Sequence, residues 1–194
     1  GRSTFDLDAV FDTLIEGAVK LCGAKRGFVA RYDGEVLRFA AGCNVTPELR
    51  TYFEEHPFAT NRGSNAGRAA LERRTIHNLD VQRDAEYTYG GARIDPYRTV
   101  LAVPMLKSGA LLGVIVIYRH EVLPFTDSQI ALVETFADQA VIAIDNVRLF
   151  NETKDALEQQ TATSDILRVI SESPHDIQPV FHAIVGAACR LFKD

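Results

Sequence analysis

The residues best suited to binding chemistry lie in one polar stretch, residues 56–98. Arginine side chains there attract anions, and tyrosine rings stack on planar groups. Such a set suits a planar, anionic small molecule, although the same residues also fit a solvated lid. With one aromatic residue from an earlier strand, the candidate ligand-binding residues are Phe39, Arg62, Ser64, Tyr87, Tyr89, Arg93, Tyr97 and Arg98.

The segment 61–68 within this stretch has a second interpretation. Ser64 is placed to cap a helix start, and Arg62 and Arg68 lie near the amides that such a start exposes, so an anion could bind there. The segment lacks the Lys-Ser/Thr pair of a phosphate-binding loop. A plain helix cap is the simpler role.

Histidine and cysteine residues show no metal or redox spacing. No two histidines stand at ligand spacing with a carboxylate, which favours structural or surface roles for His56, His77 and His120. A Cys-x-x-Cys pair is also missing from the three scattered cysteines, Cys22, Cys43 and Cys189. We predict no metal site and no catalytic residue, and the sequence identifies no cofactor.

Composition narrows the class of protein. The 194 residues are 46% hydrophobic and 24% charged, which is usual for a globular protein. A net charge of -5 argues against nucleic-acid binding, which needs a basic surface. No signal peptide opens the chain, and no apolar run approaches the roughly 20 residues of a membrane span. We expect a cytoplasmic location and no membrane contact by this piece.

The elements that must position the candidate residues are helices and hairpins. Apolar residues recur at helical spacing over residues 6–22, and Asp33-Gly34 between two strand-like runs indicates a tight hairpin with positive φ at both turn positions. Further strands are expected at 75–78, 98–105 and 111–118, and short helices at 46–55 and up to residue 74. This order predicts an α+β domain with an antiparallel sheet of five or six strands flanked by helices.

A long helix follows the last strand. Thr126 and Gln129 form a capping box, and neither glycine nor proline occurs from Phe125 to Ser173. One apolar stripe of this helix can cover the domain's own sheet, and a second stripe then needs a partner, most simply the same helix of a parallel homodimer. The heptad seam predicted for dimerisation and signalling is Ile130, Val133, Ala137, Ala140, Ile144 and Val147.

Residues 3–21 and 173–191 resemble each other at an offset of 170 residues. Both begin with Ser-x-x-Asp and continue into a Val-Phe pair at helical spacing, which favours common ancestry. We therefore expect a sensory domain over residues 1–150, a coiled-coil-like linker helix over 151–172, and the first helix of a second, truncated domain over 173–194.

Several motifs, taken in order, resemble a GAF domain over about residues 4–150. They are Gly63-Ser-x-x-Gly-Arg68, Val100-Leu-Ala-Val-Pro104, Leu112-Gly-Val-Ile-Val116, Pro124-Phe-Thr-Asp127 and Phe136-Ala-Asp-Gln-Ala140, leading to Ala143-Ile-Asp-Asn-Val-Arg-Leu-Phe150. The stretch 157–170 is similar to linkers between successive GAF domains of bacterial sensors, which typically end in a histidine kinase or a nucleotide cyclase.

The resemblance implies a ligand pocket between the sheet and residues 56–98. Arg119-His120 stands where cyclic-nucleotide-binding members carry Asn-Lys, and residues 44–188 hold no cysteine for a covalent bilin. We expect a non-enzymatic sensory module of a bacterial signalling protein, which binds an unidentified small molecule or relays signals through dimerisation. The alternatives are a ligand-free dimerisation spacer and a thiol-based small-molecule reductase that uses Cys43.

Overall fold

The computed structural model describes residues 7–172 and residue 185, without the side chains of 166 and 169–172. The chain divides into two units, Gly1–Ile144 and Asp145–Asp194. Residues 173–191, where the sequence predicts a repeat of the first helix, lie outside the described part apart from Val185. The prediction of a second, truncated domain therefore stays a prediction.

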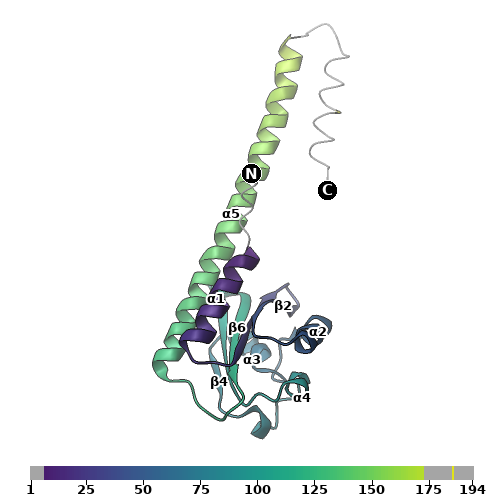
Figure 1. Ribbon diagram of the computed structural model, residues 1–194. Helices are drawn as coiled ribbons and strands as arrows, with labels where there is room; N and C mark the ends of the chain where they lie inside the picture. Colours follow the sequence, from purple (N-terminus) through teal and green to yellow (C-terminus); the bar gives the residue numbers. More distant parts are fainter. Residues whose placement is uncertain (1–6, 173–184, 186–194) are drawn as a thin grey trace. The chain divides into compact units, whose positions relative to one another are not determined.

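The first unit is built on one six-stranded antiparallel sheet (Figure 1). Its strand order is β3-β2-β1-β6-β5-β4, which places β1 and β6 at the centre. The predicted α+β class is therefore correct. The strands are β1 (Arg26–Tyr32), β2 (Val36–Cys43), β3 (Phe58–Ala59), β4 (Ile76–Asn78), β5 (Thr99–Lys107) and β6 (Ala110–Arg119).

The helices agree closely with the apolar periodicity of the sequence. The segment expected as a loop between β4 and β5 contains two short helical turns, and β3 was also not predicted, because a two-residue strand and single helical turns are too short to show a periodic pattern. The helices are α1 (Leu7–Leu21), α2 (Pro47–Glu55), α3 (Asn65–Glu72), η1 (Val81–Arg83), α4 (Gly91–Ile94) and α5 (Asp127–Glu172).

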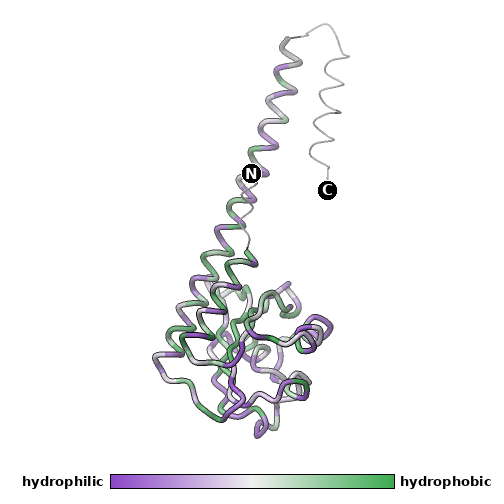
Figure 2. The backbone as a smooth tube through the Cα atoms, in the orientation of Figure 1, coloured by the Kyte–Doolittle hydropathy of each residue, from purple (hydrophilic) through white to green (hydrophobic). Residues whose placement is uncertain are grey.

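The sheet separates two hydrophobic cores. On one face α1 and the start of α5 lie side by side (Figure 1) and bury a cluster that includes Phe11, Ile15 and Ile115. On the other face α2, α3 and the segment before β5 bury a second cluster that includes Phe28, Phe53 and Tyr118. Figure 2 shows apolar residues concentrated in the central strands and in the two helices of the first face. Alternate residues of the central strands thus serve different cores.

The hairpin between β1 and β2 forms where Asp33-Gly34 predicts it, with a different turn conformation. Gly34 has a φ of +104°, whereas Asp33 is not among the residues with positive φ. The Asp33 carboxylate instead accepts hydrogen bonds from the amides of Glu35 and Val36, each at 2.9 Å. The aspartate side chain therefore stabilises the turn that its backbone was expected to form.

The predicted capping box begins α5. Gln129 N donates to Thr126 Oγ1 at 3.2 Å, and Thr126 N donates to Gln129 Oε1 at 2.9 Å. The helix then continues as one element through residues 151–172, which the sequence assigns to a linker helix. Among the described residues, no helix combines the length and apolarity that crossing a membrane requires.

The heptad seam proposed for dimerisation lies largely inside the domain's own core. Val133, Ala137 and Ala140 have exposed fractions of 0%, 2% and 0%, and Ile130 and Ile144 pack beside them. The sheet and α1 offer the nearest large apolar surface, and helical periodicity alone does not distinguish it from a second subunit. Val133, Ala137 and Ala140 are therefore covered within the domain's own core, whereas Ile130 and Ile144 are partly exposed and Val147 lies beyond this core.

Arg119, at the end of β6, ties both helices to the sheet. The guanidinium donates to Cys22 O at 2.6 Å, to Gly23 O at 3.3 Å, and to two carbonyls ahead of α5, Leu123 O at 2.9 Å and Pro124 O at 3.1 Å. It also lies 4.1 Å from the centre of the Phe125 ring. A charged group that is only 6% exposed is thus fully occupied in joining the end of α1 to the segment that precedes α5.

His77 on β4 fixes the same segment from the other side. Phe125 N donates to His77 Nε2 at 3.1 Å, which requires that nitrogen to be unprotonated. Burial and, to a smaller extent, the nearby charge of Arg119 lower the pKa of His77. A proton on Nε2 would remove the acceptor and place a second cation beside Arg119.

We predict that His77 makes the fold less stable in mild acid. Because its pKa is lower in the folded than in the unfolded state, the unfolded chain binds the proton first as pH falls through about 6.5. The free energy of unfolding should therefore fall between about pH 7 and pH 5, and His77→Gln should flatten this slope. Denaturant unfolding at several pH values measures it, with the exposed His56→Gln as the matched control. An unchanged slope in His77→Gln would contradict the assignment.

Candidate functional site

A small cavity lies between the second face of the sheet and the segment that precedes β5. Its volume is about 20 Å³, slightly more than the roughly 10–15 Å³ that one water needs. Four of the residues that line it come from the strands β1, β5 and β6, and the others come from β3, from the start of α3 and from the loops near it. The lining residues are Phe28, Phe58, Ser64, Asn65, Ala66, Tyr87, Tyr97, Val100, Val116 and Tyr118.

Stacked aromatic rings close one side of the cavity. Phe58 lies between Phe28 and Tyr89, with ring centres 5.2 and 4.5 Å apart. Tyr89 also lies beside Tyr52 and Phe53, with ring centres 5.5 and 6.2 Å apart, and its hydroxyl donates to His56 O at 2.7 Å in an exposed position. The outermost ring of the stack is thus held by neighbouring rings and by one exposed hydrogen bond.

Two tyrosine hydroxyls meet at the cavity wall. Tyr87 Oη and Tyr97 Oη are 2.6 Å apart, so one of them donates to the other. Burial raises the pKa of both phenols, which keeps them protonated at neutral pH. One of the two hydroxyls accepts this hydrogen bond, and its own proton remains available to a further acceptor, such as an oxygen of a bound molecule.

The N-terminus of α3 forms the polar end of the cavity. Ser64 caps the helix as predicted, with Gly67 N donating to Ser64 Oγ at 3.0 Å. Glycine is required at 67 because a Cβ there would lie 2.3 Å from Ala59 O and 2.6 Å from Asn61 O. This close approach holds the start of α3 against the backbone around β3, with Asn65 in the cavity wall.

A buried polar network lies behind Asn65. Asn78 Nδ2 donates to Asn65 Oδ1 at 3.1 Å and to Asp84 Oδ2 at 2.6 Å, and the same Asp84 oxygen accepts from Arg68 Nη1 at 2.5 Å. Two donors of this network have no partner in the structure, Asn65 Nδ2 and Arg68 Nη2. Buried donors without acceptors destabilise a fold by about 1–3 kcal/mol each, so they mark a place where an acceptor is expected.

The structure brings together only some of the residues that the sequence singled out. Ser64, Tyr87 and Tyr97 line the cavity, and Phe39 and Tyr89 pack on the same core beside it. The arginines lie elsewhere. Arg62 pairs with Glu72 and Glu86, Arg98 pairs with Asp80, and Arg93 is exposed.

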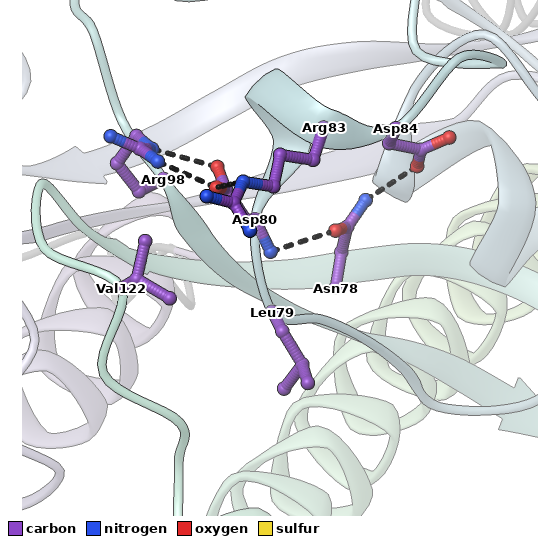
Figure 3. Close-up of a pocket in the computed structure, with 7 residues that line it drawn as sticks. All are labelled: Asn78, Leu79, Asp80, Arg83, Asp84, Arg98 and Val122. Carbon is purple, nitrogen blue, oxygen red and sulfur yellow. Dashed lines mark hydrogen bonds and ion pairs between the residues drawn. The ribbon is translucent and has the colours of Figure 1, made fainter.

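Arg98 lies in a separate surface groove of about 550 Å³ (Figure 3). There it donates from Nε and Nη2 to the two oxygens of Asp80, at 2.7 and 2.5 Å, and this pairing lowers the pKa of Asp80. Asp84, across the groove, accepts from Asn78 and Arg68. Both carboxylates are thus used to fasten the loop around η1 to the domain. We interpret the groove as a structural clamp.

A second groove, of about 340 Å³, lies outside the aromatic stack. It shares Ser64 with the small cavity, and Tyr89 belongs to its wall as well as to the stack on Phe58. Tyr52 and His56 stack on each other beside it, with ring centres 4.1 Å apart. Displacement of Tyr89 is therefore the shortest route from this groove to the cavity.

Sequence reasoning missed Asn65, Tyr118 and the charge cluster behind Tyr118. Asp95 is 4% exposed and accepts from Tyr118 Oη at 3.2 Å, pairs with Arg26, and lies 2.6 Å from His120 Nε2. An asparagine directly after a helix cap was a usable signal, because that position turns inward with the cap. The partners of Asp95 come from β1 and the end of β6, and nothing in their spacing along the chain connects them.

Histidine and cysteine side chains in the described part form no site. It contains no group of three or more histidine, cysteine or acidic residues able to hold a metal ion. Cys22 is fully buried and Cys43 half-buried, and burial raises the pKa of both thiols. Neither lines the cavity.

Comparison with known proteins gives one family and one fold. A family described as the GAF domain matches residues 5–145. The chain is similar to a GAF domain/HD domain protein of Geobacter sulfurreducens, with 20% identity and a TM-score of 0.67 over 75% of this chain and 96% of that one. It is also similar to a domain of a putative two-component sensor histidine kinase of Sinorhizobium meliloti, with 17% identity and a TM-score of 0.62 over 76% and 96%. A free methionine-R-sulfoxide reductase of Neisseria meningitidis has 15% identity and a TM-score of 0.63 over 76% and 83%.

We predict that Gly67→Ala destabilises the domain by about 1–3 kcal/mol, because the added Cβ meets backbone oxygens that cannot move separately. This loss should exceed the roughly 1 kcal/mol that alanine gains over glycine in a helix. Chemical denaturation measures the difference. Gly17→Ala is the matched control, since a Cβ there meets only the ring of Phe136, at 3.2 Å. Equal or greater stability of Gly67→Ala would contradict the close approach.

Proposed function

Because the chain belongs to the GAF domain family, we propose that it is a sensory module of a bacterial signal-transduction protein, in which a small molecule bound in the aromatic cavity controls the two helices on the opposite face of the sheet. The observation that carries this proposal is a small cavity beneath the aromatic stack whose wall contains a buried donor without an acceptor. A bound molecule would supply what the protein leaves unpaired.

The end of β6 offers a physical connection between ligand and helices. Tyr118 faces the cavity, whereas Arg119, the next residue, faces the ends of α1 and the segment ahead of α5. Neighbouring strand residues point to opposite faces, so a displacement of Tyr118 moves the backbone that carries Arg119. A ligand that prefers one position of β6 would shift the population of helix arrangements by its difference in affinity for them.

We further propose a parallel homodimer formed through the part of α5 after residue 144. The seam Ile130–Ile144 is used within the domain. In the second unit, Leu157 and Leu167 are 62% and 61% exposed, and they belong to a three- and four-residue alternation of the heptad kind. Exposed leucines at this spacing support a coiled-coil partner of the same sequence.

A ligand-free spacer is the second candidate, and the small size of the cavity favours it. About 20 Å³ holds one water, so a larger molecule enters only if Tyr89 or its neighbours move. The reductase alternative has less support, because a reactive thiol needs a lowered pKa and access to substrate. Cys43 has a raised pKa and lies outside the cavity.

Native mass spectrometry of the chain purified from cells tests the sensory proposal against the spacer. We expect a mass increment of one small molecule per chain, which disappears on unfolding. Replacement of the cavity residue Val116 by Phe should abolish the increment by filling the space, whereas Val122→Phe, at an exposed position outside the cavity, should retain it. Absence of any increment, combined with unchanged mass after incubation with cell extract, would favour the spacer.

Light scattering tests the dimer. The full chain should have twice the mass of one protomer at micromolar concentration, and a chain ending at residue 150 should dissociate at higher concentrations because it lacks Leu157 and Leu167. Leu157→Asp in the full chain should act like the truncation, since a charge inside a coiled-coil seam is strongly unfavourable. A monomeric full chain at high concentration would refute the dimer.

A further inference from the structure

The chemistry of the cavity's polar end restricts the kind of molecule that fits it. Asn65, which lines the cavity, is 3% exposed, and its Nδ2 has no acceptor. Arg68, three positions further along α3, is 7% exposed and also has one nitrogen without an acceptor, but it is not among the residues that line the cavity. Desolvated donors of this kind are satisfied by an oxygen atom from outside the protein or by a water.

Ser64 and the Tyr87–Tyr97 pair, which also line the cavity, can donate to a bound molecule, whereas the hydroxyl of Tyr118 already donates to Asp95. Ser64 Oγ accepts from Gly67 N, which leaves its hydroxyl proton available, and one hydroxyl of the Tyr87–Tyr97 pair retains its proton. The first amides of α3 add further donors and the positive end of the helix dipole.

No acidic residue is among those that line the cavity. The nearest carboxylates are already used, Asp84 by Arg68 and Asn78, and Asp95 by Arg26 and Tyr118. An ammonium or amidine group would therefore meet hydroxyl oxygens but no carboxylate, and its burial there without an opposite charge would be strongly unfavourable.

We infer that the ligand of the proposed sensory site carries a carboxylate, whose oxygen accepts from Asn65 Nδ2 at the start of α3, and a flat apolar body that lies against the Phe28–Phe58–Tyr89 stack. This inference rests on the proposed function and specifies its ligand class. The polar end selects the carboxylate because each of its oxygens accepts and none donates. The rings select the body because flat groups stack on aromatic faces.

Tyr89 is the residue that must move for such a molecule to enter. The small cavity accommodates little more than the head group, and the adjoining groove of about 340 Å³ provides room for the body once Tyr89 leaves Phe58. That movement breaks the exposed hydrogen bond to His56 O and the ring contacts of Tyr89 with Tyr52, Phe53 and Phe58. Each of these interactions is modest, and contacts with the ligand's body must offset their loss.

Three probes with the same ring separate the possible head groups: benzoate, benzamide and benzylamine. Each is titrated into the full chain at constant ionic strength, with thermal unfolding and the side-chain amide resonance of Asn65 as the two readouts. We expect benzoate to raise the melting temperature and to shift the Asn65 Nδ2 resonance at millimolar concentration. Benzamide should bind more weakly, since its nitrogen meets donors, and benzylamine should produce neither change.

Asn65→Asp is the decisive variant, because it replaces the unpaired donor by an acceptor of the same shape. We expect its affinity for benzoate to fall about tenfold or more, the loss of one hydrogen bond to a charged group. Asn151→Asp adds the same charge at an exposed position of α5, outside both the cavity and the adjoining groove, so it should bind benzoate normally. If Asn65→Asp does not fold, the shift of the Asn65 side-chain resonance in the unaltered chain still tests whether benzoate binds at Asn65.

Three results would overturn the inference: benzylamine binding as tightly as benzoate, an unchanged affinity in Asn65→Asp, or no shift of the Asn65 resonance with millimolar benzoate. In the last case a water is the partner of Asn65. A positive result with benzylamine would retain a small-molecule site and reject only its carboxylate class. The mass-spectrometric increment tests the sensory function independently.

Discussion

The arrangement of the domain depends on one buried cation. Arg119 has no carboxylate among the contacts described above, and its charge is instead distributed over carbonyl oxygens from the end of α1 and from the segment ahead of α5. Carbonyls at a helix end carry partial negative charge, so the guanidinium is stabilised by the groups that it joins. A lysine would supply the charge without the planar fork that reaches several oxygens at once. The two helices therefore share one point of attachment to the sheet.

This attachment gives β6 two roles. Its last residues alternate between the cavity, where Tyr118 contacts Asp95, and the helical face, where Arg119 acts. His77 and the capping box at Thr126 hold the segment that leads into α5, so the helix begins at a defined place and angle. Rigid packing on both faces means that small displacements of the strand are transmitted instead of absorbed. The proposed sensing mechanism therefore needs only the step along β6 from Tyr118 to Arg119 to connect the cavity with the two helices.

Local signals in the sequence were sufficient to predict the longer elements, but not the two- to four-residue elements β3, η1 and α4 or the pairing of residues far apart in the chain. The capping box, the Ser64 cap and the uninterrupted apolar run of β6 were predicted because each depends on residues within one turn or one strand. The candidate arginines were grouped with the tyrosines because they share a loop, yet Arg98 and Arg62 bind carboxylates outside the cavity. Asn65 was missed because its side-chain nitrogen Nδ2 has no acceptor in the fold, and a missing hydrogen bond leaves no pattern in the sequence. The heptad seam was ambiguous because the domain's own sheet and a partner helix select the same periodicity.

Two independent cores, separated by a sheet, allow the two faces to evolve at different rates. Under the proposed function, substitutions around Phe28, Phe58 and Tyr97 would change what the cavity accepts, while Phe11, Ile15 and Val133 pack in a different core on the far side. The proposed sensor would thereby acquire a new chemical input without a new set of helix contacts. Low sequence identity among proteins that retain this fold is the expected outcome of such a division.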